Sequence, residues 1–362
     1  MKFIDINQFK SELLKGTPVM DVRAAVEFNT GSIPGSINIP ILSDEERKEV
    51  GTCYKKQGRE AAIQLGESLV SGENLQQKVS QWSQQFHKSP QTIVTCFRGG
   101  LRSQFTQKFL ADAGISSVRL QHGYKSARQF FIDQIQDFSE KTPMLLLSGT
   151  TGSGKTQVLN QLGSEYPNID LENLAKHRGS AFGAMIEAQP SQADFENQLA
   201  LQSLKVELNN RPLLLEDESR LIGSCYIPEN FFMKMREGPV LLLQEDLESR
   251  IDMIYDDYIS SQLNEGSSFE QAQQLFEKYK GAIAKIQKKL GGLRAQELLE
   301  DLQICVNDFW LNKSLERNKI WIEKLLVWYY DPMYTSSLST RNPKIIFQGS
   351  REEIIAYLRL QK

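Results

Sequence analysis

The sequence predicts an α/β protein: one parallel-sheet domain, then a second α/β domain with a largely helical C-terminal extension. Short apolar runs alternate with helical segments through most of the chain, which is the pattern of parallel sheets covered by helices. TIVT (92–95) and MLLLSG (144–149) each lead into a glycine-containing loop and then a helix. Parallel strands place such loops at one edge of the sheet, where ligands bind.

The first domain is expected over residues 1–136. Its strands are predicted at 19–23, 92–95 and 117–120, because each is a short apolar run bounded by charged or turn-forming residues. The polar stretch 44–88 carries apolar residues at helical spacing and predicts helices.

Residues 137–142 are polar and precede a proline, which predicts a linker to a second domain over 143–362. After MLLLSG, further strands are expected at 212–218 (PLLLEDE) and 239–244 (PVLLLQ).

Helices are expected between and after these strands. SQAD (191–194) is a capping box that begins a helix running to about Leu208. The pattern from about 246 to 327 is almost entirely helical, and KIIFQGSREEII (344–355) predicts a last strand and a capped last helix.

The composition is that of an ordinary globular protein, with 40% hydrophobic and 24% charged residues. No apolar run reaches the about 18 residues of a membrane helix and the first residues lack a signal-peptide core, so we expect a cytoplasmic protein without membrane contact. The four cysteines show no CxxC pairing, which favours free thiols. A net charge of −3 argues against indiscriminate coating of nucleic acid and still allows a local basic surface.

GTTGSGKT (149–156) matches the phosphate-binding pattern G-x-x-x-x-G-K-[ST] at every fixed position, between an apolar strand and a helix. Backbone N–H groups of such a loop surround phosphate oxygens, and its lysine adds a mobile charge. We therefore predict a phosphate or diphosphate site, in which the threonine would hold Mg²⁺ if one is used. The binding residues are Gly149, Thr150, Gly152, Ser153, Gly154, Lys155 and Thr156.

Polar residues on neighbouring elements are candidates to contact the ligand of this loop. One acid of 216–218 could serve a metal ion as a Walker-B-type carboxylate, or these acids could only end a strand. The loop at 177–180 could bind an anion or be a surface turn, and Arg250 could contact phosphate or lie exposed on its helix. The candidates are Asp170, His177, Arg178, Ser180, Glu216, Asp217, Arg220 and Arg250.

CFRGGLRS (96–103) places a cysteine between an apolar strand and a helix, beside two arginines. A helix N-terminus with Arg98 and Arg102 favours the thiolate, so we expect Cys96 to be a nucleophile rather than an inert buried thiol.

DVR (21–23), GSIPGSINIP (31–40) and LQHGYKSAR (120–128), together with the cysteine loop, resemble the rhodanese domain family over about residues 3–132. The resemblance implies a Cys96 that is ringed by backbone N–H groups and accepts a sulfur-like atom as a persulfide.

The cysteine loop departs from the sulfur-handling members of that family. Cys96 and Arg102 also satisfy Cys-x5-Arg followed by Ser, which is a phosphatase signature, and the loop is one residue longer than the typical persulfide loop. A loop of this length can surround a tetrahedral oxyanion. The residues therefore leave both a persulfide carrier and a phosphate-ester hydrolase open.

Four further stretches resemble one family over nearly the whole chain, the tRNA 2-selenouridine synthases. They are VGTCYKKQG (50–58), ENLAKHRGSAFG (172–183), LEDESRLIG (215–223) and YYDPMY (329–334). The resemblance implies a transferase that converts wobble 2-thiouridine in tRNA to 2-selenouridine through an S-geranyl intermediate. Its co-substrates would be geranyl diphosphate and then selenophosphate. The enzyme would need no tightly bound cofactor and could use Mg²⁺. A selenophosphate-producing enzyme could be a second partner.

The resemblance implies that each of the two loops binds one of the two co-substrates. We expect Lys155 to neutralise the departing diphosphate. We expect Cys96 to take or position selenium while Arg98 and Arg102 hold the phosphate of selenophosphate.

A basic run at 278–294 is the expected tRNA contact, on a helix that breaks at Gly291-Gly292. The run contains no acid. A helix face that is only exposed to solvent would show the same pattern of charges. Its cations are Lys278, Lys280, Lys285, Lys288, Lys289 and Arg294.

The residues alone leave other functions open. An ATP-dependent kinase or NTPase with a rhodanese sulfur-carrier domain would use the same phosphate loop, and a Cys-x5-Arg phosphatase would use the same cysteine loop. A non-enzymatic tRNA-binding scaffold is disfavoured by the intact Cys96 and Lys155.

Overall fold

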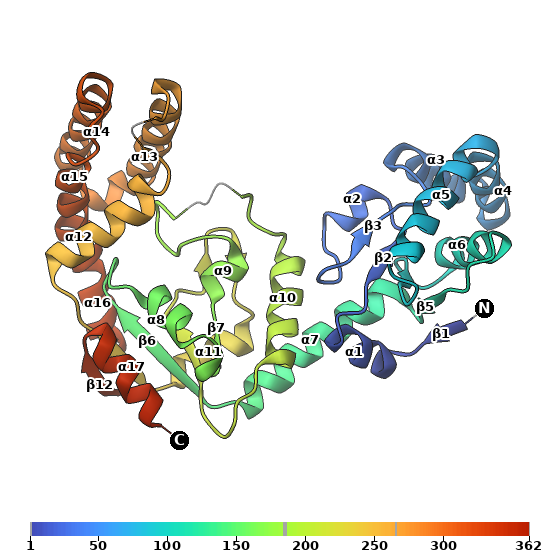
Figure 1. Cartoon of the computed structure of the whole chain (residues 1–362), viewed down its shortest axis with the longest axis horizontal. Coiled ribbons are helices and arrows are strands. Elements are labelled where there is room, and N and C mark those ends of the chain that lie inside the picture. Colours follow the sequence, from blue (N-terminus) through green and yellow to red (C-terminus); the bar gives the residue numbers. More distant parts are fainter. Residues whose placement is uncertain (1, 184–186, 265, 362) are drawn as a thin grey trace. The chain divides into compact units, whose positions relative to one another are not determined.

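The computed structural model describes residues 2–183, 187–264 and 266–361 (Figure 1). It forms two compact units: Met1–Phe138 with Pro190–Lys205, and Ser139–Gln189 with Val206–Lys362. Each unit is built on a five-stranded sheet whose neighbouring strands are all parallel, which confirms the predicted fold class.

The first unit has the strand order β1-β5-β4-β2-β3. Its core packs Met20, Val94 and Cys96 from the sheet against Trp82 and Phe86 of a covering helix. The strands are β1 (Lys2–Ile4), β2 (Val19–Asp21), β3 (Ile37–Asn38), β4 (Ile93–Thr95) and β5 (Val118–Leu120). The helices are α1 (Ile6–Leu14), α2 (Ala25–Phe28), α3 (Asp44–Gln57), α4 (Arg59–Leu69), α5 (Gly72–Lys88), α6 (Leu101–Asp112), α7 (Gly123–Lys141) and α10 (Gln192–Lys205).

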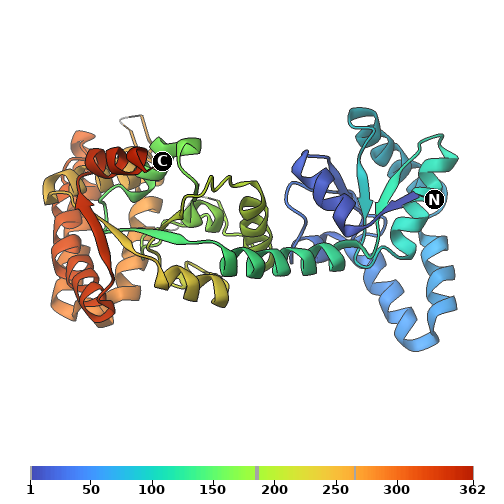
Figure 2. The same ribbon diagram turned by 90° about the horizontal axis from the view of Figure 1, so that it is seen from below.

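Helix α7 runs without a break through residues 137–141 of the expected linker, and Figure 2 shows it as one continuous helix. The polar residues of this stretch are compatible with a helix, and Pro143 prevents the helix from continuing.

Helix α10 belongs to the first unit although it follows the phosphate loop in the sequence. Its cap is the predicted one, since Ser191 Oγ accepts from the Asp194 amide at 3.1 Å. Asp194 in turn accepts from the amide and hydroxyl of Ser32 at 2.7 and 2.9 Å, and Arg128 donates to Asn197 at 2.8 Å.

The second unit has the strand order β12-β11-β6-β8-β7. Its sheet buries Leu145, Leu147 and Leu214 against Val158 and Ile354 of the covering helices. The strands are β6 (Met144–Gly149), β7 (Asn168–Ile169), β8 (Leu213–Glu216), β11 (Val240–Leu243) and β12 (Ile345–Gly349), with an antiparallel pair β9 (Leu221–Ile222) and β10 (Cys225–Tyr226). The helices nearest the sheet are α8 (Lys155–Leu162), η1 (Gly163–Glu165), α9 (Leu171–Ala175), α11 (Glu229–Glu237) and α17 (Arg351–Leu360).

The predicted helical region is confirmed and has its own core, in which Phe182, Tyr279 and Trp321 pack together. Two of its segments, η2 and η3, are π-helical, a rare form that is frequent at functional sites. In the described ranges, no helix is both long and apolar enough to cross a membrane. The elements are α12 (Leu247–Tyr255), η2 (Asp256–Ser260), α13 (Phe269–Leu290), α14 (Gly292–Asn312), α15 (Asn318–Leu325), η3 (Leu326–Tyr330) and α16 (Asp331–Arg341).

Candidate active sites

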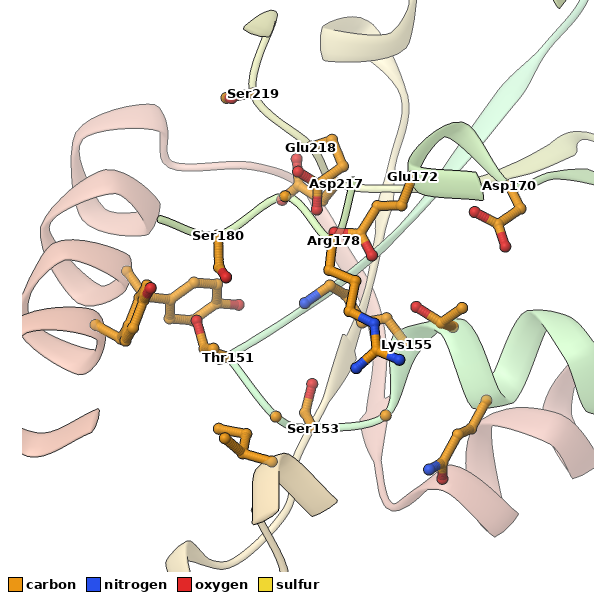
Figure 3. Close-up of a pocket in the computed structure, with 18 of the residues that line it drawn as sticks. Thr151, Ser153, Lys155, Asp170, Glu172, Arg178, Ser180, Asp217, Glu218 and Ser219 are labelled. Atoms are coloured by element: carbon orange, nitrogen blue, oxygen red, sulfur yellow. The ribbon is translucent and has the colours of Figure 1, made fainter. Parts of the chain in front are cut away.

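The phosphate loop joins β6 to α8 and lines a cavity of about 840 Å³ in the second unit (Figure 3). Gly154 caps α8 with a φ of 88°, and a Cβ at this position would lie 2.8 Å from Arg351 Cδ. Glycine is therefore required for the turn that brings the N-terminus of α8 to the cavity. A helix N-terminus stabilises a bound anion.

Two side chains of the loop indicate an anionic ligand. Lys155 Nζ donates to the carbonyl of Gly149 at 3.1 Å, so the lysine lies along its own loop. The hydroxyl of Ser153 is buried and has no hydrogen-bond partner among the described residues. A buried hydroxyl without a partner costs free energy, which a phosphate oxygen would recover.

The end of β8 supplies the carboxylate closest to the loop. Thr156 Oγ1 donates to Glu216 Oε1 at 2.7 Å, while Glu216 Oε2 is buried without a partner in the described part of the chain. Burial, with the charges of Asp170 and Glu218, raises the pKa of Glu216 to about 8. Burial and the neighbouring Glu216 and Glu218 raise the pKa of Glu172 to about 10.

These oxygen donors suit a hard cation such as Mg²⁺, because Thr156 and Glu216 stand in the relation of a P-loop hydroxyl to its Walker-B-type carboxylate. Over the described residues, no group of three or more His, Cys, Asp or Glu side chains is arranged as a metal site. Thr156 and Glu216 are therefore the two side chains that would hold such a cation if one is bound.

Asp217, the middle acid of the EDE sequence, is fully engaged with protein groups. It accepts from Ser148 at 2.6 Å, from Arg236 at 3.0 Å and from both terminal nitrogens of Arg341. Both arginines line the cavity, and nothing in the sequence near them indicates a site.

The loop after α9 also faces the cavity. Arg178 reaches toward the segment with Ser153 and Lys155 (Figure 3), and it donates to the carbonyl of Asp257 at 2.9 Å. Ser180 Oγ lies 3.2 Å from the hydroxyl of Tyr258. Arg178 and Ser180 therefore line the same cavity as the phosphate loop, as do the predicted contacts Asp170, Asp217 and Arg220.

Of three other predicted contacts, two line the cavity and one does not. Asp170 lines the cavity and caps α9, accepting from the Asn173 amide at 2.8 Å. Arg220 lies at the cavity and pairs with Glu229 at 3.6 Å, with both side chains largely exposed. His177 is not among the lining residues. Burial and the charges of two lysines on α13 lower the pKa of its imidazole.

Arg250 lies beneath the phosphate loop rather than in the cavity. Its Nε donates to the carbonyl of Thr151 at 2.9 Å, and its terminal nitrogens bind both oxygens of Asp331 at 2.6 and 3.1 Å. The residue is 5% exposed. Arg250 therefore positions the loop, and the aspartate of the YYDPMY stretch holds Arg250.

Aromatic side chains form one wall of the cavity. The π-helical segments η2 and η3 supply Tyr258 and Tyr330, and α16 supplies Met333 and Tyr334. Burial raises the pKa of Tyr258 to about 12. The cavity thus has an anion-binding side and an apolar, aromatic side.

The cysteine loop joins β4 to α6 in the first unit. Cys96 is 2% exposed, and its thiol donates to Ser103 Oγ at 3.3 Å. The loop is closed by Gly123, where a Cβ would lie 2.1 Å from the carbonyl oxygen of Cys96. None of the four cysteines, all of which lie in the described residues, forms a disulfide.

Arg102 is engaged by an acid that the sequence did not single out as its partner. Its terminal nitrogens bind both carboxylate oxygens of Glu27, at 2.5 and 3.1 Å. Although burial opposes the charged form of each group, this pairing lowers the pKa of Glu27 and raises that of Arg102, which Cys96 also helps to raise. Arg98 is exposed and lies over the ring of Phe97, at 5.8 Å from its centroid.

The basic run is divided between two helices, because Gly291 ends α13 and begins α14 as predicted. Lys285, Lys288 and Lys289 are exposed on α13. Lys280 pairs with Glu277 at 2.8 Å, and Arg294 lies over the ring of Trp328 at 5.6 Å. Lys278 and Lys285 act on the pKa of His177, so this end of the run lies near the loop after α9.

The fold and the two loops define a P-loop protein with an N-terminal rhodanese-type domain. A family model for the rhodanese-like domain matches residues 5–128, and a model described as the tRNA 2-selenouridine synthase AAA domain matches residues 142–362. The chain belongs to the tRNA 2-selenouridine synthase family.

Proteins named tRNA 2-selenouridine synthase are similar over the full length. One from Nitrosomonas europaea is 46% identical and aligns over 99% of both chains. One from Bdellovibrio bacteriovorus is 45% identical over 98% of this chain and 97% of its own. One from Pseudomonas fluorescens is 41% identical over 98% of both.

Proposed function

We propose that this enzyme converts 2-thiouridine at the wobble position of tRNA to 2-selenouridine by way of S-geranyl-2-thiouridine. The observation that carries the proposal is that two loops with anion-binding sequence patterns, one around Lys155 and one around Cys96, follow strands of two separate sheets. A reaction with two phosphorus-containing co-substrates needs two such places. Membership of the tRNA 2-selenouridine synthase family supports the overall conversion.

The first step is assigned to the cavity of the second unit. The sulfur of 2-thiouridine bonds to C1 of geranyl diphosphate, the C1–O bond breaks, diphosphate leaves with the bonding electrons, and the base loses its N3 proton. Lys155, Arg178 and the N-terminus of α8 stabilise the leaving charge. Where Mg²⁺ is bound, Thr156 and Glu216 would hold it, and it would share in neutralising the diphosphate.

The second step is assigned to the cysteine loop. Selenium of selenophosphate bonds to C2 of the base, the C2–S bond breaks, and the geranylthiolate leaves and takes up a proton. Water then cleaves the Se–P bond, so that phosphate is released and a proton returns to N3. The length of the Cys96–Arg102 loop suits a tetrahedral anion of this kind.

The electron balance limits the role of Cys96. If the thiolate removed selenium from selenophosphate as a perselenide, the phosphorus would leave as phosphite rather than phosphate. We therefore assign Cys96 to positioning the chalcogen within the loop. Arg102 would exchange part of its pairing with Glu27 for the phosphate oxygens, and the exposed Arg98 would approach from outside.

The tRNA is assigned to the basic run on α13 and α14, since exposed lysines supply the sequence-independent attraction to phosphates. Tyr279 of α13 donates to the carbonyl of Tyr258, which lines the phosphate-loop cavity, and this contact supports a tRNA path from the basic run to that cavity.

The test uses the full chain, tRNA from cells lacking the gene, both co-substrates, and mass spectrometry of the nucleosides. Cys96→Ser should accumulate S-geranyl-2-thiouridine. Lys155→Ala should leave 2-thiouridine unchanged but still selenate tRNA that was geranylated beforehand. A Cys96→Ser variant that selenates fully but does not geranylate would reverse the assignment of loops to steps. Unchanged selenouridine and geranyl-thiouridine in cells lacking the gene would refute the function.

A further inference from the structure

A second cavity, of about 620 Å³, lies within the first unit beside the cysteine loop. Its volume is within the about 300–1,000 Å³ of typical small-molecule sites. Leu101 and Arg102, at the end of the cysteine loop, form part of its wall. Its apolar lining consists of Ile41, Leu42, Val50, Ala62, Ile63, Val70, Leu101, Phe105 and Phe109.

The cavity is lined on one side by α3 and α4, two helices joined at Gly58 and seen as a hairpin in Figure 2. All residues of these helices are described, yet α3 buries none of its 14 residues and α4 buries only Ala62. A helix on a globular domain normally buries an apolar stripe. The apolar positions Val50 and Ile63 are instead only partly covered and face the cavity.

The lining of this cavity also carries a strong positive charge. Its two carboxylates are Glu27 and Glu67, and Glu27 is already paired with Arg102. The cations are Arg47, Lys48, Lys55, Arg59 and Arg102. An apolar interior with a cationic lining complements a hydrocarbon chain that is attached to an anionic carrier.

We propose that this cavity binds the ten-carbon isoprenoid chain of the reaction intermediate, with the tRNA that carries it as the anionic partner. The inference rests on the proposed function, because the S-geranyl nucleoside arises only there. A chain held against Phe105 and Phe109 has its sulfur end at the Leu101–Arg102 wall, next to the loop that contains Cys96. Geranyl diphosphate has the same chemistry, a C10 chain on an anion, and the experiment below separates the two sources.

The experiment uses the full chain, selenophosphate and anticodon stem-loop RNAs that carry S-methyl-, S-dimethylallyl- or S-geranyl-2-thiouridine. In the parent protein we expect the KM of the RNA to fall about tenfold or more for each isoprene unit, because each buried carbon favours binding. Val50→Trp fills the cavity and should raise the KM of the S-geranyl RNA about a hundredfold or more, to that of the S-methyl RNA, abolishing the dependence on chain length.

The matched control is Val79→Trp, which alters a half-buried valine packed against the same core but outside the cavity. It should keep the parent's dependence on chain length. Ile63→Glu is a second cavity variant, which places a carboxylate among the apolar side chains and should weaken S-geranyl RNA far more than S-methyl RNA. Thermal unfolding of each variant shows whether it is folded.

A parallel series with unmodified 2-thiouridine RNA and geranyl diphosphate identifies the carrier. A raised KM for S-geranyl RNA in the selenation series supports the tRNA-borne chain. A raised KM for geranyl diphosphate alone would overturn that assignment and make the cavity a donor site. If the parent selenates S-geranyl and S-methyl RNA with the same KM, no isoprenoid site exists here.

Failure of the proposed function would look different, because the parent would then convert none of the RNAs. In that case the affinities of the full chain for S-geranyl and S-methyl RNA, measured by direct binding, still test whether the cavity binds the isoprenoid chain. Tighter binding of the S-geranyl RNA that Val50→Trp abolishes would support the cavity, and equal binding would overturn it.

Discussion

The carboxyl groups of Glu172, Glu216 and Glu218, near Lys155, have pKa values raised above those of isolated side chains. Burial is the main cause, and charge repulsion from neighbouring carboxylates adds to it at Glu172 and Glu216. At Glu218 the hydrogen bond with Glu172 lowers the pKa instead. Lys155 opposes this effect at Glu172, Glu216 and Glu218. The raised pKa values of Glu172 and Glu216 reduce the negative charge that these two side chains present to an anion at the phosphate loop.

Glu172→Gln is predicted to change the pH dependence of stability. The pKa of Glu172 is raised from 4.5 to about 10, so the folded chain keeps a proton that the unfolded chain loses within this range. The contribution of this carboxyl to stability is therefore fully present below pH 4.5 and declines as the pH rises toward 10. The amide does not ionise, so thermal unfolding should show a higher Tm for the variant at about pH 8.5, by about 2–4 °C for each kcal/mol gained.

At about pH 4.5 the Glu172→Gln variant and the parent should unfold at nearly the same temperature. Glu60→Gln, at an exposed glutamate of the first unit, controls for the replacement itself. A Tm difference that is the same at both pH values would show that Glu172 is not held in its neutral form.

Single residues were predictable where a motif fixes their spacing and not where the fold supplies the partner. Lys155, Thr156 and Cys96 follow from local patterns. Glu27 could not be assigned to Arg102, because the two are 75 positions apart and meet only when β2 and β4 pair. Arg341 reaches Asp217 across 124 positions for the same reason.

At the scale of elements, one buried arginine connects three parts of the second unit. Arg250 on α12 binds the carbonyl of Thr151 in the phosphate loop and the carboxylate of Asp331 at the start of α16. The loop is therefore held from below by two helices that come about 100 residues or more later in the chain.

Arg250→Lys is predicted to impair geranylation selectively. Lysine keeps the positive charge, but a compact ammonium cannot hold both oxygens of Asp331 and the Thr151 carbonyl in the geometry of a guanidinium. We expect the KM of geranyl diphosphate to rise about tenfold, since a displaced loop loses part of its contact with the anion. Selenation of pre-geranylated tRNA should be unchanged.

The control for this variant is Arg359→Lys, which alters an exposed arginine paired with Glu165 at the end of α17. Such surface pairs contribute little to stability, so this variant should match the parent in both steps. Equal loss of both steps in Arg250→Lys would indicate general unfolding rather than a misplaced loop.

Most elements follow from local sequence, while their packing does not. The capping boxes at Ser43, Ser268 and Ser350 and the glycine stop at Gly291 set helix ends through neighbouring residues only. The placement of α10 on the first unit depends instead on Ser32 and Arg128, which lie far away in the sequence. The π-helical form of η2 and η3 has no periodic signature either.

At the scale of the whole molecule, a chain with a net charge of −3 concentrates cations on two surfaces. One is the lining of the cavity beside the cysteine loop, and the other is the exposed side of α13. Each unit therefore has its own surface for a polyanion, which fits an RNA that presents one nucleoside to two chemical steps.

Lys285→Ala with Lys289→Ala is predicted to weaken tRNA binding through a measurable loss of phosphate contacts. The two lysines are four positions apart on α13, so they project from one face of the helix, and both are exposed. Each lost phosphate contact should reduce the slope of log Kd against log salt by about 0.7–0.9. Fluorescence anisotropy with labelled tRNA over a salt series should therefore give a slope lower by about 1.4–1.8, while the KM of geranyl diphosphate stays unchanged.

Lys234→Ala with Lys344→Ala removes the same charge from the same unit outside the run and should leave the slope unaltered. An equal change in both double variants would mean that α13 contributes only to the general charge of the protein and does not contact the tRNA backbone.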